Sequence, residues 1–94
     1  MDMPKVSNCG MEKCSYNSQG RCHAMAINVG GAEGAMCDTF AETSAKCVSN
    51  GGSGKVGACR MIGCEFNDCL ECMAPSVEIT KSNNHPFCLT FKSR

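Results

Sequence analysis

Cysteine is the residue with the most chemistry to offer in this chain, and eight of its ten cysteines follow one spacing pattern that occurs twice. The first copy reads C-x4-C-x7-C-x14-C and the second reads C-x4-C-x7-C-x15-C. Four thiolates complete a closed tetrahedral Zn²⁺ site. The pattern therefore predicts two metal centres, with these ligands: Cys9, Cys14, Cys22 and Cys37 in the first copy, and Cys59, Cys64, Cys72 and Cys88 in the second.

Zinc is the metal that this pattern favours, with two ions per chain. Iron is the rival metal for four thiolates, whereas an iron–sulfur cluster is disfavoured because neither copy contains a C-x2-C-x2-C run. The usual zinc ribbon uses C-x2-C knuckles, so the repetition of the spacing strengthens the prediction more than the spacing itself. A closed site leaves no position for water or substrate, so we expect no catalytic residue and no enzyme activity.

Two histidines lie near the predicted ligands. His23 directly follows Cys22, and His85 lies three residues before Cys88. Neither has a histidine counterpart in the other copy, so neither belongs to the repeated pattern. We interpret both as surface or turn residues, and the Pro86 that follows His85 is typical of turns.

Two cysteines, Cys47 and Cys69, stand outside the repeat. Cys69 forms a C-x-x-C pair with Cys72, a spacing found in thioredoxin-type redox sites, but no βαβ pattern surrounds it. Three interpretations of Cys47 and Cys69 stay open. They are free thiols, they form a disulfide with each other under oxidation, or Cys69 replaces Cys72 as a ligand.

Composition makes metal a more natural source of stability than a large apolar core. The 94 residues include no Trp, one Tyr and four Phe, and units of roughly 35 residues rarely fold by apolar burial alone. The N-terminal sequence has no basic region followed by an apolar one, so we expect no signal peptide, and reduced, metal-binding thiols. Disulfides are the alternative to metal. No apolar stretch reaches the ~18 residues that span a membrane.

The charge balance argues against binding to nucleic acid. The chain has nine basic and nine acidic residues, and two zinc ions bound by eight thiolates would change its net charge by −8 + 4 = −4. Binding to a phosphate backbone needs clustered Lys and Arg, and Lys92 with Arg94 is too few.

The repeat extends beyond the cysteines. One constant offset relates the copies without a gap up to Val29 and Ile79, and one residue is then added before the last cysteine. The matched pairs are Met11 with Met61, Tyr16 with Phe66, Asn17 with Asn67, Ala24 with Ala74, Ile27 with Val77, Val29 with Ile79, Thr39 with Thr90, and Phe40 with Phe91. Six of these pairs share one offset and the last two follow the single added residue, so the matches identify an internal repeat.

Short strands and tight turns are the predicted secondary structure. Residues 26–29 and 76–79 alternate apolar and polar side chains, which indicates half-buried strands, and we expect each to pair with a strand that leads back to the last cysteine. The first two cysteines of each copy lie in a short turn, and residues 17–20 favour a left-handed turn. Residues 41–46 could form one or two helical turns.

The predicted fold class is a small, metal-stapled, mainly antiparallel β structure with little helix, built from two tandem units of the zinc-ribbon or knuckle type. The first unit covers residues 1–44 and the second covers residues 58–94. Residues 45–57 form a linker whose Gly and Ser content predicts flexibility. The units would then reorient freely unless their apolar faces dock.

The motif C-x4-C-x-[YF]-N-x4-C-x-A-x2-[IV]-x-[VI], followed by C-x-T-F, closely resembles the cysteine-rich domain of unknown function 1540 of bacteria and archaea. The resemblance covers residues 9–40 and 59–91. It implies small, often paired domains that bind metal through the four cysteines and have no assigned activity. It also implies a microbial, cytoplasmic protein. Cys47, Cys69 and the histidines fall outside the motif, so the resemblance gives them no role.

Three classes of function remain. The first is a non-enzymatic zinc-binding module that binds a protein partner or a second copy of itself, and the two closed sites favour it. The second is a thiol-based redox or metal sensor that releases zinc on oxidation, with Cys47 and Cys69 as triggers. The third, a nucleic-acid-binding zinc ribbon, is disfavoured by the charge balance and the few aromatic residues.

Overall fold

The computed structural model describes residues 3–31, 34–43, 45–47 and 54–94, and within them the regular structure consists of strands and turns without a helix. The strands are β1 (Lys5–Cys9), β2 (Asn17–Ser18), β3 (Arg21–Cys22), β4 (Ile27–Gly31), β5 (Gly34–Cys37), β6 (Val56–Cys59), β7 (Asn67–Asp68), β8 (Glu71–Cys72), β9 (Ser76–Ser82) and β10 (His85–Cys88). The predicted strand-rich fold is confirmed. The helical turns expected at residues 41–46 are wrong for the described part of that stretch, which is irregular.

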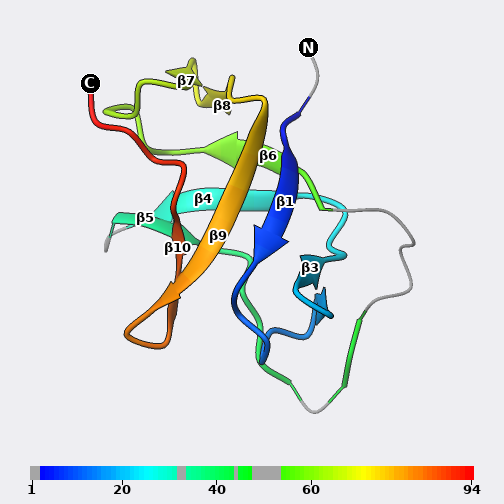
Figure 1. The fold of residues 1–94 in the computed structure, drawn as a ribbon. Helices are drawn as coiled ribbons and strands as arrows, with labels where there is room; N and C mark the ends of the chain where they lie inside the picture. The colour runs from blue at the N-terminus through cyan, green and yellow to red at the C-terminus, as the bar shows by residue number, and fades with distance from the viewer. Residues whose placement is uncertain (1–2, 32–33, 44, 48–53) are drawn as a thin grey trace.

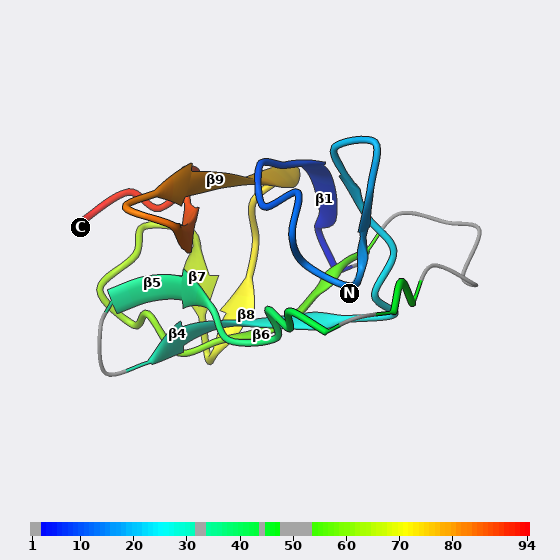
Figure 2. The same cartoon turned by 90° about the horizontal axis from the view of Figure 1, so that it is seen from below.

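Six strands form the main sheet, in the order β1-β9-β10-β5-β4-β6. The two predicted alternating segments become β4 and β9, and each turns back into an antiparallel partner, β5 or β10, that ends at the last cysteine of its repeat. The short hairpins β2-β3 and β7-β8 make two further two-stranded sheets. In Figure 1, β9 and β1 cross in front of β4, β5 and β6, and Figure 2 shows these groups as two layers.

The first strand of each repeat pairs with the other repeat. β1 lies parallel to β9, so that Val6 faces Val77 across the ladder and Cys9 faces Ile79. β6 lies parallel to β4 in the equivalent register, with Val56 opposite Ile27. The sheet therefore mixes both repeats through an exchange of strands, which ties the repeats together and does not leave them free to reorient.

An approximate two-fold axis relates the repeats. Equivalent residues meet each other at two points, at the Met36–Phe87 pair between β5 and β10 and at the isolated bridge between Lys5 of β1 and Lys55, which directly precedes β6. Because β1 and β6 are the outer strands of the sheet order, this bridge closes the sheet into a flattened barrel. Matched sequences thus produce matched positions on opposite sides of one axis.

The apolar core fills the space between the two layers. Its most buried large side chains are Val6, Ile27, Val56 and Val77, each at most 2 % exposed, and they come equally from the two repeats. Residues 48–53 of the predicted Gly- and Ser-rich linker lie outside the described residues, and the last two linker residues, Val56 and Gly57, belong to β6. The domain boundaries at 44 and 58 stay a prediction.

The turn between β9 and β10 differs from the one expected. Asn83 and Asn84 both have positive φ angles, of 51° and 63°, as in the two-residue turns that match the twist of a hairpin. His85 and Pro86 belong to β10 rather than to the turn, so the turn interpretation of His85 is wrong, whereas its surface position is confirmed. Two consecutive Asn residues tolerate the left-handed conformation and therefore take the turn.

Candidate metal centres

The four predicted ligands of each repeat come from four different elements. The first cysteine ends β1 or β6, and the third lies in β3 or β8. The second follows a tight turn in which the Cys14 N–H donates to the Met11 carbonyl at 3.0 Å and the Cys64 N–H to the Met61 carbonyl at 2.9 Å. The fourth ends β5 or β10. The predicted turn between the first two cysteines is therefore present, but the strand that precedes it was not expected.

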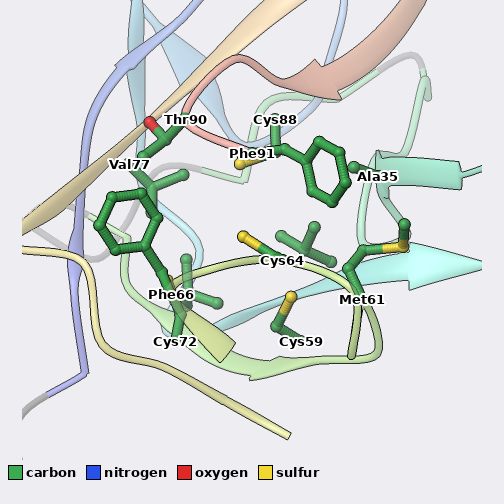
Figure 3. Close-up of a pocket in the computed structure, with 12 residues that line it drawn as sticks. Ala35, Cys59, Met61, Cys64, Phe66, Cys72, Val77, Cys88, Thr90 and Phe91 are labelled. Atoms are coloured by element: carbon green, nitrogen blue, oxygen red, sulfur yellow. The ribbon is translucent and has the colours of Figure 1, made fainter. Parts of the chain in front are cut away.

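A small cavity brings together the four predicted ligands of the second repeat. It has a volume of about 20 Å³ for the centre of a water-sized sphere, which is room for about one such sphere. Figure 3 shows the sulfur atoms of Cys59, Cys64 and Cys88 directed toward this space, with Phe66 and Phe91 on either side. The lining residues are Val29, Ala35, Val56, Cys59, Met61, Cys64, Phe66, Cys72, Val77, Cys88, Thr90 and Phe91.

The first repeat contains the equivalent cavity, also of about 20 Å³. Its lining residues are Cys9, Met11, Cys14, Tyr16, Cys22, Ile27, Cys37, Thr39, Phe40, Ile79 and Pro86. The matched Met, aromatic, Thr and Phe positions of the sequence repeat recur in both linings. Each lining also includes residues of the other repeat, such as Ile79 in the first cavity and Val29 in the second.

Each cavity joins the two layers of the barrel. Cys9 lies on β1, in the layer with β9 and β10, whereas Cys37 lies on β5, in the layer with β4 and β6 (Figure 2). In the second cavity the roles reverse, because Cys59 lies on β6 and Cys88 on β10. This follows from the strand exchange, and it means that an ion bound in either cavity would link both layers.

A buried asparagine fixes the first cysteine of each set. Asn17 Nδ2 donates to the Cys9 carbonyl at 2.9 Å, and Asn17 Oδ1 accepts from the Gly20 N–H at 3.2 Å. Asn67 makes the same bond to the Cys59 carbonyl at 2.9 Å. Both side chains are buried. The sequence repeat matched these asparagines but did not reveal their role, because the alignment says nothing about which carbonyl they reach.

Burial favours the neutral thiol in both cavities. The pKa of Cys37 is raised to about 11: burial is the largest cause, a hydrogen bond from the Thr39 backbone lowers the pKa, and the nearby Cys22, Cys9 and Cys14 raise it. Burial likewise raises the pKa of Cys22, Cys72 and Cys88. A thiol in such a site holds its proton at neutral pH unless a metal ion displaces it.

Backbone N–H groups point at several of these sulfur atoms. The Ala24 N–H bonds to Cys22 and the equivalent Ala74 N–H bonds to Cys72, and each lowers the pKa that burial raises. The fourth cysteine receives the Thr39 N–H in the first repeat, and the Thr90 and Phe91 N–H groups in the second. Donors aimed at sulfur stabilise a thiolate, so the donor set fits a bound cation better than it fits free thiols.

The backbone arrangement and the N–H donors suit a bound metal ion, whereas the sulfur atoms are not yet close enough together to coordinate one. Within the described part of the chain, no three Cys, His, Asp or Glu side chains converge closely enough to hold an ion as they stand. Coordination requires the thiol side chains to close in on the cavity that they already line. The assignment of the eight cysteines as ligands therefore stays a prediction.

The other candidate residues lie away from both cavities. Neither His23 nor His85 contributes to the two linings, and His23 is partly buried. Cys47 and Cys69 are exposed free thiols, while Cys72 lines the second cavity. The arrangement favours Cys72 over Cys69 at that cavity.

Comparison with known families agrees with the repeated geometry. The family model described as Domain of Unknown Function (DUF1540) matches residues 8–49 and again residues 58–91. The chain belongs to the DUF1540 family. The two matched segments contain all ten cysteines, which is consistent with two tandem copies of the DUF1540 domain, and the second segment ends before Arg94. No curated protein and no solved structure matches the chain. Among the described residues, no helix has the length and apolar character needed to cross a membrane.

Proposed function

We propose that this DUF1540 protein is a non-enzymatic zinc-binding protein with two structural four-cysteine centres, one in each repeat. The observation that carries the proposal is that four cysteines of each repeat line one small apolar cavity, with backbone N–H groups donating to several of the sulfur atoms. Two ions would staple the layers of the barrel in the manner of zinc-ribbon or knuckle units. Iron is the alternative metal, because it also accepts four thiolates.

The residues that would hold the ions are the eight repeated cysteines. Bound zinc supplies a positive charge that keeps the thiols deprotonated and links segments far apart in the chain. The surrounding Met and aromatic side chains limit the access of water, and the asparagines fix the first cysteine of each set. Four protein ligands would leave no coordination position for water or substrate, so we propose a structural role and no catalysis.

Native mass spectrometry with metal analysis tests this proposal. We expect two zinc ions per chain and ten reduced cysteines. A chain without metal whose mass shows the loss of hydrogen expected for disulfides would refute it. As a control, replacing one cysteine in each repeat with Ser should abolish stoichiometric metal binding at both sites. The mass of the metal-free chain should then differ from wild type only by the two substitutions.

The partner of the folded module is proposed to be another protein or a second copy of the chain, in the reducing cytoplasm. Exposed apolar side chains suit such contacts, and four of them belong to the second repeat: Ile62, Leu70, Met73 and Leu89. The equivalent positions in the first repeat are Glu12, Gly20, His23 and Asp38. The shared fold therefore does not itself require apolar residues at these positions.

A redox or metal sensor is the second candidate function, and the two exposed thiols favour it. The Cys47 N–H donates to the Ser15 carbonyl at 2.7 Å, next to the ligand candidate Cys14. Cys69 has a positive φ of 51° at the exposed tip between β7 and β8. A mild peroxide titration separates the two functions, since a sensor should lose zinc reversibly and a structural module should retain it until damaged.

A further inference from the structure

A lysine that follows the first repeat bonds to the loop that carries the second cysteine. Lys46 Nζ donates to the carbonyls of Glu12 at 2.9 Å, Cys14 at 3.0 Å and Asn17 at 2.8 Å. A lysine ammonium has three N–H donors, so these three carbonyls use all of them. The loop that presents Cys14 is thus gathered around one positive charge.

An arginine performs the equivalent role in the second repeat. Arg94 Nε donates to the Ile62 carbonyl at 3.0 Å, Arg94 Nη2 bonds to the Asn67 carbonyl, and the Arg94 N–H donates to the Gly63 carbonyl at 2.9 Å. Ile62 and Asn67 are the counterparts of Glu12 and Asn17. Two different cations therefore reach two equivalent carbonyls in the two ligand loops, whereas the third carbonyl belongs to Cys14 in the first loop and to Gly63 in the second.

The two cations arise from segments that do not align. Lys46 lies six residues after Phe40, whereas Arg94 lies three residues after Phe91 and beyond the DUF1540 match. Each repeat thus has a cation bonded to its ligand loop, but the two cations come from positions that do not correspond. Duplication of one ancestral sequence does not by itself explain this arrangement. Among the described residues neither cation forms a salt bridge with a carboxylate, and the salt bridge in that part of the chain joins Lys92 to Glu65.

The physical need is clearest for a loaded site. Four thiolates and one divalent ion leave a net charge of −4 + 2 = −2 in a partly buried cavity, where charge is costly. A fixed cation bonded to the carbonyls of the ligand loop offsets part of that charge, and it also satisfies carbonyls that would otherwise repel one another. In the first repeat these carbonyls include that of Cys14 itself, whereas in the second they belong to neighbours of Cys64. The effect should weaken as salt screens the exposed side of the cation.

We propose that Lys46 and Arg94 are positioning residues for the two thiolate centres, each holding one ligand loop in shape and offsetting the negative charge of its own loaded site. The inference rests on the proposed zinc function for its electrostatic part. Its positioning part concerns the loops alone and holds with or without metal.

Zinc affinity of full-length variants tests the electrostatic part, by competition with a chromophoric chelator. Lys46→Met should weaken one of the two ions about tenfold, a typical effect of losing an outer partner of a metal ligand, and Arg94→Met should weaken the other. Lys46→Arg should restore binding, whereas the neutral Lys46→Gln should not, and the deficit of Lys46→Gln should shrink at high salt. Lys92→Met is the matched control, because Lys92 makes only an exposed ion pair of 3.7 Å.

A spectroscopic readout identifies which centre responds. Co²⁺-loaded Lys46→Met should show altered thiolate charge-transfer absorption for half of the bound ions. Wild-type affinity for both ions in Lys46→Met and Arg94→Met, or an equal loss in Lys92→Met, would overturn the electrostatic part.

Hydrogen exchange of the metal-free, reduced protein tests the positioning part separately. The amides of residues 12–17 should exchange several-fold faster in Lys46→Met, and those of residues 62–67 in Arg94→Met, with no change in Lys92→Met. Unchanged exchange would refute the positioning role. A wild-type protein that binds no metal yet shows this exchange pattern would refute the proposed zinc function and the electrostatic part, and would leave the positioning role supported.

Discussion

Replacing Asn17 with Ala should destabilise the protein, because the Asn17 side chain holds the backbone of Cys9 in place. The side chain is 2 % exposed and bonds at once to the Cys9 carbonyl and the Gly20 N–H, at 2.9 Å and 3.2 Å. The variant removes both bonds and leaves the carbonyl of the buried residue Cys9 without the donor that Asn17 supplies.

The size of the effect follows from these contacts. Each lost hydrogen bond contributes about 1 kcal/mol net, and an unsatisfied buried carbonyl costs about 1–3 kcal/mol. The expected loss in the free energy of unfolding is therefore about 3 kcal/mol. At about 4–8 °C per kcal/mol for a domain of this size, the melting temperature should fall by about 12–24 °C.

Urea denaturation of the reduced protein measures this loss, at a fixed free zinc concentration because bound ligand shifts apparent stability. Asn67→Ala is the matched variant, since Asn67 makes the equivalent bonds to Cys59 and Leu70. Asn28→Ala on the exposed face of β4 is the control, with an expected change within about 0.5 kcal/mol. A value for Asn17→Ala no larger than that of Asn28→Ala would refute the proposed brace.

Three further predictions concern the cavities and the shared sheet. Gly54→Ala should selectively weaken metal binding at the first centre, because the added Cβ would lie 2.7 Å from Cys22 Sγ. Gly63→Ala should leave metal affinity unchanged, because nothing lies within 4 Å of its Cβ position. Chelator competition compares the metal affinities of the two variants, and equal affinities would contradict the geometry. Metal loading at pH 7 should release at least two protons per ion in the first centre, because burial raises the pKa of Cys37 to about 11 and also raises that of Cys22, so affinity should fall as pH falls. Calorimetry in buffers of different ionisation enthalpy counts the protons, and a release of fewer than about two per ion would contradict the prediction. Cys64→Ser should lower the temperature of a single cooperative thermal transition, because the repeats share one sheet; two separate transitions by circular dichroism would show independent units.

Much of the candidate site could be predicted from local sequence. The eight cysteines that line the two cavities, their division into two sets and the apolar and aromatic residues around them all follow from one repeated pattern, because each set of four cysteines comes from one short repeat. The strands β4 and β9 were also predictable, since alternation of apolar and polar residues directly reflects the two faces of a strand.

The exchanged strands β1 and β6 were not predictable in this way. Each is short, and its partner lies in the other repeat, so no local pattern indicates the pairing. The close approach that it requires appears only in three dimensions, where a Cβ on Gly30 would lie 2.9 Å from the Cβ of Arg60. Gly30, with a φ of 107°, therefore allows the chain that follows β6 to pass.

Lys46 and Arg94 show the same limit for the site itself. Both lie after the last matched pair of their repeats, at positions that do not align with each other, and a lone cation in a polar segment has no sequence signal for its function. Their role depends on carbonyl groups that a folded loop directs to one point, and backbone carbonyls are the same in every residue type.

The sequence by itself determined that two equivalent sets of four thiols exist, because ligand chemistry resides in side chains and their spacing. The tertiary structure decided that the two sets share one barrel, that each would bridge both layers, and that a cation closes each ligand loop. Those features depend on which distant strands pair and where backbone groups converge, and both are settled by packing of the whole chain around its common core.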